Sequence, residues 1–323
     1  MIMGDGSVDI HQHLWPESFI EELRLRSKPP NLVGWTLHTS HEQPYAVTPA
    51  HHDVALRVEA DSDVDQVLLS MSTPLGVAEL APDEATTLLK SWHDGVAELG
   101  APFRAWASVC NREPDLHELK ELFARGFVGL QIGADQLATP AAIERIAALL
   151  EVCQNADVPV LVHPGAVGSD PAARDEAARD KDARDGAARD EARPAWWSAV
   201  VDYPTQMQAA WWSWFVAGRT LLPALRICFA AGAGLAPAHA ERFVARSGQP
   251  FRLDRDVFLD TSSYGPRGLD SLVRILGVDT LVFGTDRPYA EPTDPRIGPE
   301  ATRAIRVSNP HRLLKGDQPL PRS

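Results

Sequence analysis

The residues with the clearest capacity for chemistry are two histidines near the N-terminus, separated by a single residue. His11 and His13 follow the apolar run Val8–Ile10. On a β-strand, residues i and i+2 point to the same side, so both imidazoles would face one direction. Neutral imidazoles are good ligands for divalent ions such as zinc. Such pairs also arise by chance, so this pair alone does not separate a metal site from two core or surface histidines.

Two further residues of the ligand type follow apolar runs elsewhere in the chain. His163 ends the run PVLVH, and Asp286 follows the run LVFG. A buried carboxylate without a partner is costly, so Asp286 needs either a metal ion or the neighbouring Arg287. Three imidazoles and one carboxylate suit Zn(II), Mn(II), Fe(II) or Co(II). We expect a divalent metal, zinc first and manganese second, that polarises a substrate oxygen or generates hydroxide.

These residues can meet only if the strands that carry them end side by side. Apolar runs alternate with helix-like stretches, and most are continuous, as in parallel strands buried on both faces. This alternation predicts an α/β fold of the (β/α)8 TIM-barrel type, with the site at the C-terminal ends of the strands. An open, doubly wound sheet is the alternative. The predicted strands are Val8–Ile10, Val64–Met71, Arg104–Val109, Phe127–Ile132, Val158–His163, Leu225–Phe229, Val257–Thr261 and Thr280–Gly284; the clearest helices are Pro82–Leu99, Asp115–Ala124 and Pro140–Asn155.

Composition narrows the class of protein. The 323 residues fit one barrel domain spanning 1–323. A net charge of -13 disfavours nucleic acid and anionic membranes as partners. The three cysteines show no metal-binding spacing, and each lies in an apolar stretch typical of a reduced core thiol. No basic segment followed by an apolar one opens the chain, and no apolar run reaches the length of a membrane span. We therefore expect a cytoplasmic protein.

Two segments interrupt the barrel pattern. Ser27–His52 is rich in proline, histidine and aromatic residues and follows the first strand, so it is either a substrate loop or an ordinary surface loop. In 170–193, Ala-Arg-Asp recurs every five residues, a period that fits neither a helix face nor a strand. We expect this second segment to be a solvated charged insertion after strand five, helical or disordered. A lid role is the less favoured alternative.

A cluster of aromatic residues follows the charged segment. Trp211 to Phe215 is apolar nearly all round, which predicts a buried helix. The tryptophans of this region could wall a pocket for a flat substrate, fill the core, or form a subunit interface. Trp196 and Trp197 are the better placed for a pocket, because they follow strand five and its loop.

Three short motifs carry a resemblance to a known family. HQH after strand one, VHPG after strand five and GTDRP after strand eight resemble the amidohydrolase-related family that includes aminocarboxymuconate semialdehyde decarboxylase. FVGLQIG and NPHRLL extend the resemblance along the chain. It implies a metal-dependent decarboxylase or hydrolase of a small aromatic or unsaturated carboxylic acid or carbonyl compound, working as a homodimer. It also implies four metal ligands, His11, His13, His163 and Asp286.

The sequence departs from this family at Ala231. The family has a histidine there, which hydrogen-bonds the metal-bound water and serves as acid or base. Asp286 is the first candidate to replace it as the catalytic base. The other candidates for catalytic or substrate contacts are Trp15, His38, His41, Arg57, Trp196, Tyr264 and Arg287.

The departure keeps two further functions open. One is a metal-assisted cyclase or dehydratase of a biosynthetic pathway. The other is a catalytically inactive barrel that binds a ligand, which Ala231 favours and the four retained ligand-type residues disfavour.

Overall fold

A computed structural model describes residues 6–40, 43–166, 194 and 196–317. The charged insertion predicted at 170–193 and the candidate His41 lie outside these residues.

Each of the eight predicted strands is present, and the eight run parallel in two hydrogen-bonded groups, β1-β5-β6 and β11-β10-β9-β8-β7. Their residues are almost all buried, which explains why the runs are continuously apolar. The bounds are β1 Val8–Gln12, β5 Gln66–Leu69, β6 Phe103–Ala105, β7 Leu130–Gly133, β8 Val160–His163, β9 Ile227–Phe229, β10 Val257–Asp260 and β11 Leu281–Val282.

Bridges connect the two groups of strands at both of their edges. Gln12 pairs with Arg287 on one side, and Ala107 pairs with Leu130 on the other, both in parallel. The amide of Ile10 also donates to the carbonyl of Phe283 at 2.9 Å. The mixed α/β, TIM-type fold predicted from the sequence is therefore present, and β1 lies beside the segment that carries Asp286.

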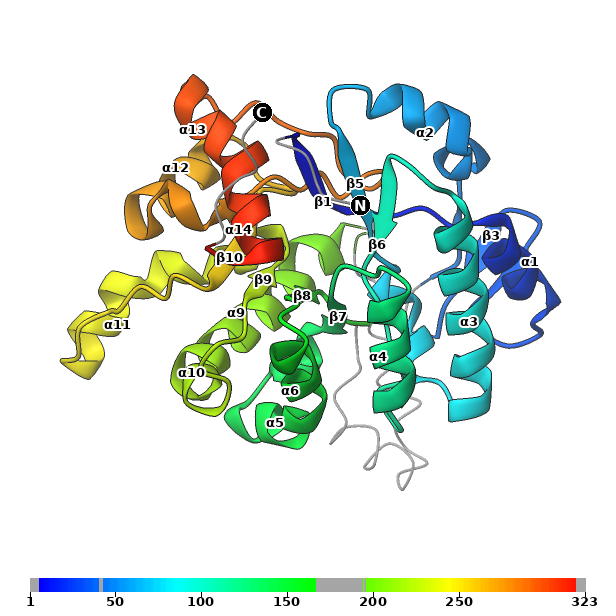
Figure 1. Cartoon of the computed structure of the whole chain (residues 1–323), viewed down its shortest axis with the longest axis horizontal. Helices are drawn as coiled ribbons and strands as arrows, with labels where there is room; N and C mark the ends of the chain where they lie inside the picture. The colour runs from blue at the N-terminus through cyan, green and yellow to red at the C-terminus, as the bar shows by residue number, and fades with distance from the viewer. Residues whose placement is uncertain (1–5, 41–42, 167–193, 195, 318–323) are drawn as a thin grey trace.

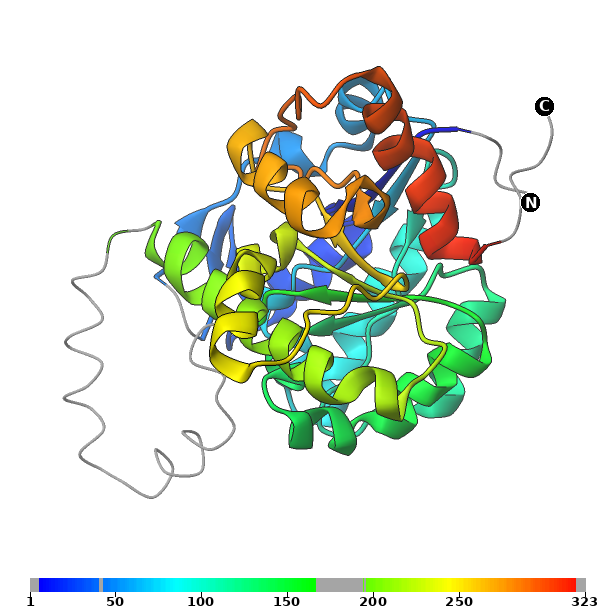
Figure 2. The same cartoon turned by 90° about the vertical axis from the view of Figure 1, so that its left-hand side faces the viewer.

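Helices surround the strands, as Figures 1 and 2 show. The helix predicted at Pro140–Asn155 is broken at Ile146, whose φ of -102° and ψ of 10° are not helical, into α5 and α6. The bounds are α1 Glu17–Leu25, α2 Val54–Ala60, α3 Pro82–Glu98, α4 Leu116–Ala124, α5 Pro140–Arg145, α6 Ala147–Asn155, α9 Tyr203–Ser213, α10 Arg219–Leu221, α11 Ala240–Ser247, α12 Pro266–Leu276, α13 Pro299–Arg303 and α14 Asn309–Lys315.

The segment after β1, predicted as a loop, contains a small antiparallel sheet. Its strands are β2 Asn31–Val33, β3 Thr36–His38 and β4 Tyr45–Ala46. Leu32 and Leu37 lie directly opposite each other across β2 and β3, and both are buried. This cross-strand apolar pair packs the hairpin against the core. The sequence does not predict the pairing, because the apolar runs in this segment are short.

The predicted apolar helix is confirmed in part. Trp211 on α9 is buried and meets Phe229 of β9 with ring centroids 5.4 Å apart. Trp214 is buried in the π-helical segment 214–218 that continues α9. Trp212 and Phe215 are only half-buried and stack with aromatic rings from outside the helix. The prediction that this stretch packs in the core is therefore confirmed for Trp211 and Trp214.

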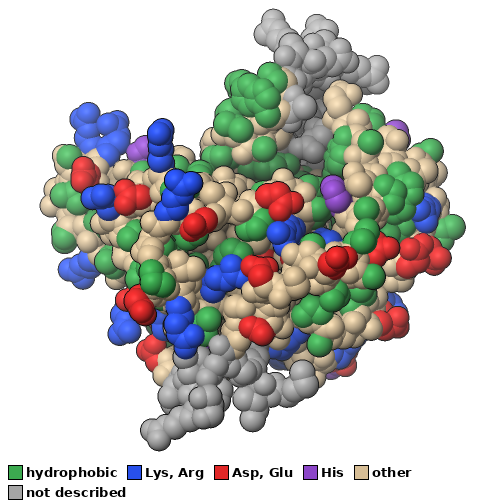
Figure 3. Space-filling view, turned by 90° about the horizontal axis from the view of Figure 1, so that it is seen from above, with side chains coloured by type: hydrophobic (Ala, Val, Ile, Leu, Met, Phe, Trp, Pro, Cys, Tyr) green, Lys and Arg blue, Asp and Glu red, His purple; other side chains and the backbone are tan. Residues whose placement is uncertain are grey.

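Two further observations concern the surface. On the face drawn in Figure 3, acidic and basic side chains are interspersed rather than separated into fields of one sign. Within the described ranges, no helix combines the length and apolarity needed to cross a bilayer.

A left-handed turn follows β9. Five consecutive residues, 231–235, have positive φ, and three of them are not glycine. Left-handed backbone costs about 1–2 kcal/mol for each L-residue with a side chain, so the surrounding packing must hold the turn in place. The turn packs closely against α9 at Gly234, because a Cβ added there would lie 2.5 Å from the carbonyl oxygen of Pro204.

We predict that Gly234→Ala lowers the free energy of unfolding by about 3 kcal/mol, since it combines left-handed strain with a steric clash. The matched control is Gly248→Ala, where φ is +68° but nothing lies within 4 Å of the added Cβ. This control is expected to cost about 1 kcal/mol. Urea unfolding followed by circular dichroism measures both, and equal losses would contradict the close approach to Pro204.

Candidate metal centre

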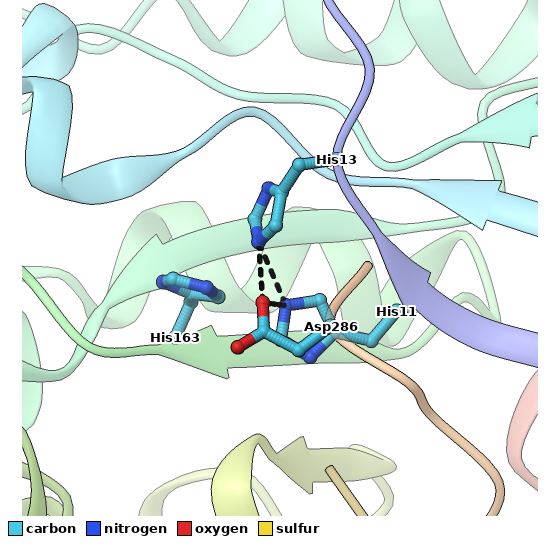
Figure 4. A group of neighbouring side chains, drawn as sticks. All are labelled: His11, His13, His163 and Asp286. Carbon is cyan, nitrogen blue, oxygen red and sulfur yellow. Dashed lines mark hydrogen bonds and ion pairs between the residues drawn. The ribbon is translucent and has the colours of Figure 1, made fainter. Parts of the chain in front are cut away.

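Four side chains converge at the C-terminal ends of the strands. Figure 4 shows the four side chains pointing toward one another. Their ligand atoms all lie within 4.8 Å of one another. His11 lies in β1, His13 directly after it, His163 at the end of β8, and Asp286 on the segment after β11. Oδ1 of Asp286 is 3.0 Å from Nε2 of His13 and 3.5 Å from Nε2 of His11. The structure thus brings together the four residues that the sequence predicts as ligands.

The four groups differ in their access to solvent. The three histidines are buried, whereas the side chain of Asp286 is 20% exposed. Asp286 has a φ of +62°, which is unusual for a residue other than glycine. Its amide donates to the carbonyl of His11 at 2.9 Å, and its own carbonyl accepts from Tyr289 at 2.8 Å. These bonds hold a strained backbone in place and aim the carboxylate at the imidazoles.

Backbone carbonyls orient two of the imidazoles. Nδ1 of His13 lies 2.8 Å from the carbonyl oxygen of Ser70, and Nδ1 of His163 lies 2.9 Å from that of Pro164. A carbonyl oxygen only accepts, so each Nδ1 must carry the proton. The lone pair therefore resides on Nε2, the nitrogen that faces the centre. This second hydrogen bond is typical of histidines that bind metal ions, so the residues fit a divalent ion.

Asp260 orients the third imidazole, and the sequence analysis did not single it out. Its Oδ2 lies 2.6 Å from Nδ1 of His11. The hydroxyl of Ser262 donates to Oδ1 at 2.7 Å, and the amide of Ser262 does so at 3.1 Å. Asp260 is fully buried at the end of β10. The sequence feature that could have identified Asp260 is its position near the end of the predicted strand VFLDT.

The electrostatics favour a positive charge at this place. Burial opposes charge on His11, but the hydrogen bond and the charge of Asp260 outweigh it and raise the pKa of His11 to about 9. Burial lowers the pKa of His13 and of His163, which keeps both imidazoles neutral. Burial would raise the pKa of Asp286, but its contact with the imidazole of His13 and the other histidines nearby outweigh burial and lower that pKa. A divalent ion would replace the proton that His11 otherwise carries.

A buried polar network lies behind the cluster. Both carboxylate oxygens of Asp9 accept hydrogen bonds, from Gln12, Thr285 and the amide of His11. Burial raises the pKa of Asp9 to about 6, although these hydrogen bonds lower it. Gln12 also donates to Asp61 at 2.9 Å. The network ties β1 to the segment after β11.

The arginines predicted as contacts serve this network. Arg287 bonds to Oδ1 of Asp61 at 2.5 Å and to Glu291, so it is not the partner of Asp286 in this structure. Arg57 is buried and donates to the carbonyl of His13 at 2.7 Å and to Gln12. Both guanidinium groups thus bond to protein atoms in this structure, and their contact with a substrate carboxylate stays a prediction.

The other predicted contact residues lie in different surroundings. Trp15 is buried and stacks on His52 with ring centroids 4.4 Å apart, and its contact with a substrate stays a prediction. His38 is half-buried in β3. Tyr264 is half-buried, and burial together with the charge of Asp260 raises its pKa. Trp196 is 55% exposed, beside Trp197.

Tyr289 is a neighbour that the sequence analysis missed. Its ring centroid is 5.3 Å from that of His13, and its hydroxyl lies 3.4 Å from Oγ of Ser72. The ring is half exposed. It follows Asp286 closely in the chain, in the continuation of the motif GTDRP, which was the available signal.

Ala231 lies at the end of β9, where the family histidine was expected. Its amide donates to the hydroxyl of Ser262 at 3.2 Å. Position 231 is therefore connected through Ser262 and Asp260 to His11, although its own side chain offers no acid or base.

A family model described as Amidohydrolase matches residues 8–315. The chain belongs to the amidohydrolase family. No curated protein matches its sequence. The amidohydrolase resembles several solved structures at low identity. IDCase from Metarhizium anisopliae, in its apo form, has a TM-score of 0.70 and 18% identity, with 97% of each chain covered.

Two further solved structures are similar. The 2,6-dihydroxybenzoate decarboxylase from Rhizobium has a TM-score of 0.66 and 18% identity, covering 98% of this chain and 100% of that one. A dihydroxybenzoic acid decarboxylase from Polaromonas, with bound manganese and the inhibitor 2-nitroresorcinol, has a TM-score of 0.66 and 19% identity, covering 98% of each chain. At these identities the likeness shows a shared fold.

We predict that Asp260→Asn weakens divalent metal binding by about 10- to 100-fold, because the amide no longer fixes the proton of His11 on Nδ1. Asp256→Asn is the matched control, since Asp256 precedes the opposite end of the same strand. Competition titration with a chromogenic chelator measures both affinities. Equal affinities in the two variants would contradict the orienting role of Asp260.

Metal affinity should rise with pH. His11 binds a proton below a pKa of about 9, and an ion must displace that proton from Nε2. The apparent affinity should therefore increase by up to about tenfold per pH unit as the pH rises toward 9, and level off above it. Calorimetry in buffers of different ionisation enthalpy should detect about one proton released per ion at pH 7. A pH-independent affinity between pH 6.5 and 8.5 would contradict this prediction.

Proposed function

We propose that this amidohydrolase is a metal-dependent decarboxylase of a small aromatic carboxylic acid, with His11, His13, His163 and Asp286 as the metal ligands. The observation that carries the proposal is the convergence of these four groups at the C-terminal ends of the strands, each imidazole presenting Nε2 to one point. The solved structures of similar fold support the choice of reaction, since two of those compared are named as decarboxylases of dihydroxybenzoic acids.

The reaction breaks the bond between the ring and its carboxylate. Carbon dioxide leaves, the electron pair stays on the ring carbon, and a proton must reach that carbon. When bound, a divalent ion would act as a Lewis acid that stabilises negative charge on substrate oxygens. Transfer of the proton to the ring carbon requires a side chain of the protein.

Asp286 is the group proposed to move this proton. Its pKa is lowered by the histidines around it, so it is a carboxylate at neutral pH and can first act as a base. It takes a proton from an acidic group of the substrate and returns it to the ring carbon as the carbon–carbon bond breaks. Its partial exposure places it between the buried imidazoles and the open end of the strands. This role compensates for Ala231.

Four other residues are proposed to contact the substrate. Tyr264 and Tyr289 carry hydroxyl groups that can donate to a substrate oxygen, and the exposed ring of Tyr289 lies next to His13. His38 would enter from the antiparallel sheet that follows β1. Trp196 is proposed as an apolar wall, because its exposed ring follows strand β8 in the chain.

We further propose that the eight strands form a closed barrel within a single domain, supported by the bridges at both edges of the two groups. Zinc is the proposed ion, and manganese is the alternative that the Polaromonas structure suggests. The family resemblance supports a homodimer. A cytoplasmic location completes the proposal.

The first experiment joins metal analysis to an assay. Purified protein is expected to hold about one equivalent of zinc or manganese by mass spectrometry, and to release carbon dioxide from at least one member of a panel of hydroxylated benzoic acids. A chelator should abolish this release, and the same ion should restore it. Release that survives removal of the metal would overturn the proposal, and so would a protein that binds no ion at all.

Asp286→Asn tests the proton-transfer role. We expect metal to remain bound, although more weakly, and the rate of carbon dioxide release to fall by about 100-fold or more at saturating metal. Asp294→Asn, an exposed acid on the same segment, is the control and should keep the full rate. Full activity of metal-loaded Asp286→Asn would show that another group moves the proton.

A further inference from the structure

A cavity lies away from the candidate metal centre. Its volume is about 720 Å³, and it opens between the segment 214–218 after α9, helix α11 and the residues that lead into β10. Figure 1 shows α9, α10 and α11 on the side of the molecule next to β9 and β10. Its lining includes Val257, the first residue of β10, and Thr280, which precedes β11. The cavity is therefore at the N-terminal ends of these strands, opposite the end where the metal ligands converge.

The walls of the cavity are aromatic. Trp211, Trp214, Phe215, Phe243 and Phe251 contribute to its lining. Phe215 and Phe251 are stacked with an interplanar angle of 5° and ring centroids 5.4 Å apart. A space of this size with flat apolar walls is typical of sites for small molecules. The rings favour a flat ligand, because such a ligand can stack against them.

Two buried donors in the lining have no partner. Trp211 and Trp214 are more than nine-tenths buried, and within the described ranges neither indole N–H makes a hydrogen bond. Both residues line the cavity, but each indole nitrogen is itself enclosed by protein, so they present their rings to the cavity. A flat ligand that stacks on these rings would change the surroundings of both N–H groups.

The charges of the lining favour an anion. Arg219 bonds in a bidentate manner to Asp254, at 2.7 and 3.0 Å, so these two charges balance. Arg252 and Arg255 also line the cavity, and no ion pair of either side chain occurs among the described residues. In the part of the chain that the structure describes, two cations at one cavity thus stand outside any ion pair, in a protein whose net charge is -13. Guanidinium groups bind carboxylates through paired hydrogen bonds.

We propose that this cavity is a binding site for a flat aromatic carboxylate, separate from the candidate metal centre. The aromatic body lies among the rings of Phe215, Phe251 and Trp214, and the carboxylate lies at the rim near Arg252 and Arg255. This inference does not depend on the reaction proposed for the metal centre.

The test uses 2-naphthoate as the probe and naphthalene-2-carboxamide as its uncharged analogue. The indole N–H resonances of the nine tryptophans are followed by NMR in the full-length protein, and Trp211→Phe and Trp214→Phe assign the two that matter. We expect 2-naphthoate to shift one or both of these resonances. No shift at either would overturn the proposal, whether the cavity is simply empty or covered by a second copy of the chain.

Charge-removal variants sharpen the test. The double variant Arg252→Gln, Arg255→Gln should bind 2-naphthoate at least about tenfold more weakly, with little change for the amide. The control double variant is Arg242→Gln, Arg246→Gln, which removes the same charge from exposed positions on α11 outside the lining. If both double variants bound 2-naphthoate equally weakly, the loss of affinity would come from the change in overall charge and not from a contact with Arg252 or Arg255. That result would overturn the assigned site.

A final variant separates the two sites. His163→Ala alters the metal centre and should leave the naphthoate-induced shifts of Trp211 and Trp214 unchanged. If His163→Ala abolished binding, the probe would be at the metal centre and the proposal would be wrong. Carbon dioxide release by the Arg252→Gln, Arg255→Gln variant should match that of the wild type, so failure of either proposal can be recognised without the other.

Discussion

The hydrogen bond between His11 and Asp260 is the interaction on which the site depends. It joins the first strand of the barrel to β10 and places a fully buried carboxylate behind a buried imidazole. A buried carboxylate is stable only when it is paired, so this bond favours a positive charge on the far side of His11. The two remaining imidazoles stay neutral because burial lowers their pKa, and the Nδ1 atom of each bonds to a backbone carbonyl. One imidazole thus has a charged partner behind it, and the other two have neutral partners.

The network behind the cluster explains why the ligands keep their spacing. Asp9 bonds to the amides of His11 and Thr285, and therefore fixes the backbone on both sides of the seam between β1 and the segment after β11. Asp61 joins Gln12 to Arg287 across the same seam. These groups lie outside the cluster of ligand atoms, yet Gln12, Thr285 and Arg287 are each next to a ligand in the sequence. Their charges are compensated within the network, which leaves the centre free to hold an ion.

Much of this arrangement could be predicted from the sequence, because apolar runs mark buried parallel strands and polar residues at their ends stand out. His163 and Asp286 were found in this way. Asp260 was missed because a single aspartate at a strand end does not reveal which imidazole it will face. The stacking of Trp15 on His52 and the ion pair of Arg287 with Asp61 were also beyond the sequence, since both partners come from distant positions. The break at Ile146 reflects tertiary packing, which local helical periodicity does not encode.

The unequal exposure of the four ligands has a consequence for the order of events. The imidazoles are closed off by the barrel, and Asp286 alone among the four has a side chain open to solvent. If an ion and a substrate both enter on the side of Asp286, they pass the same carboxylate. An ion bound first would then lie beneath the substrate, and the bound substrate would slow its escape.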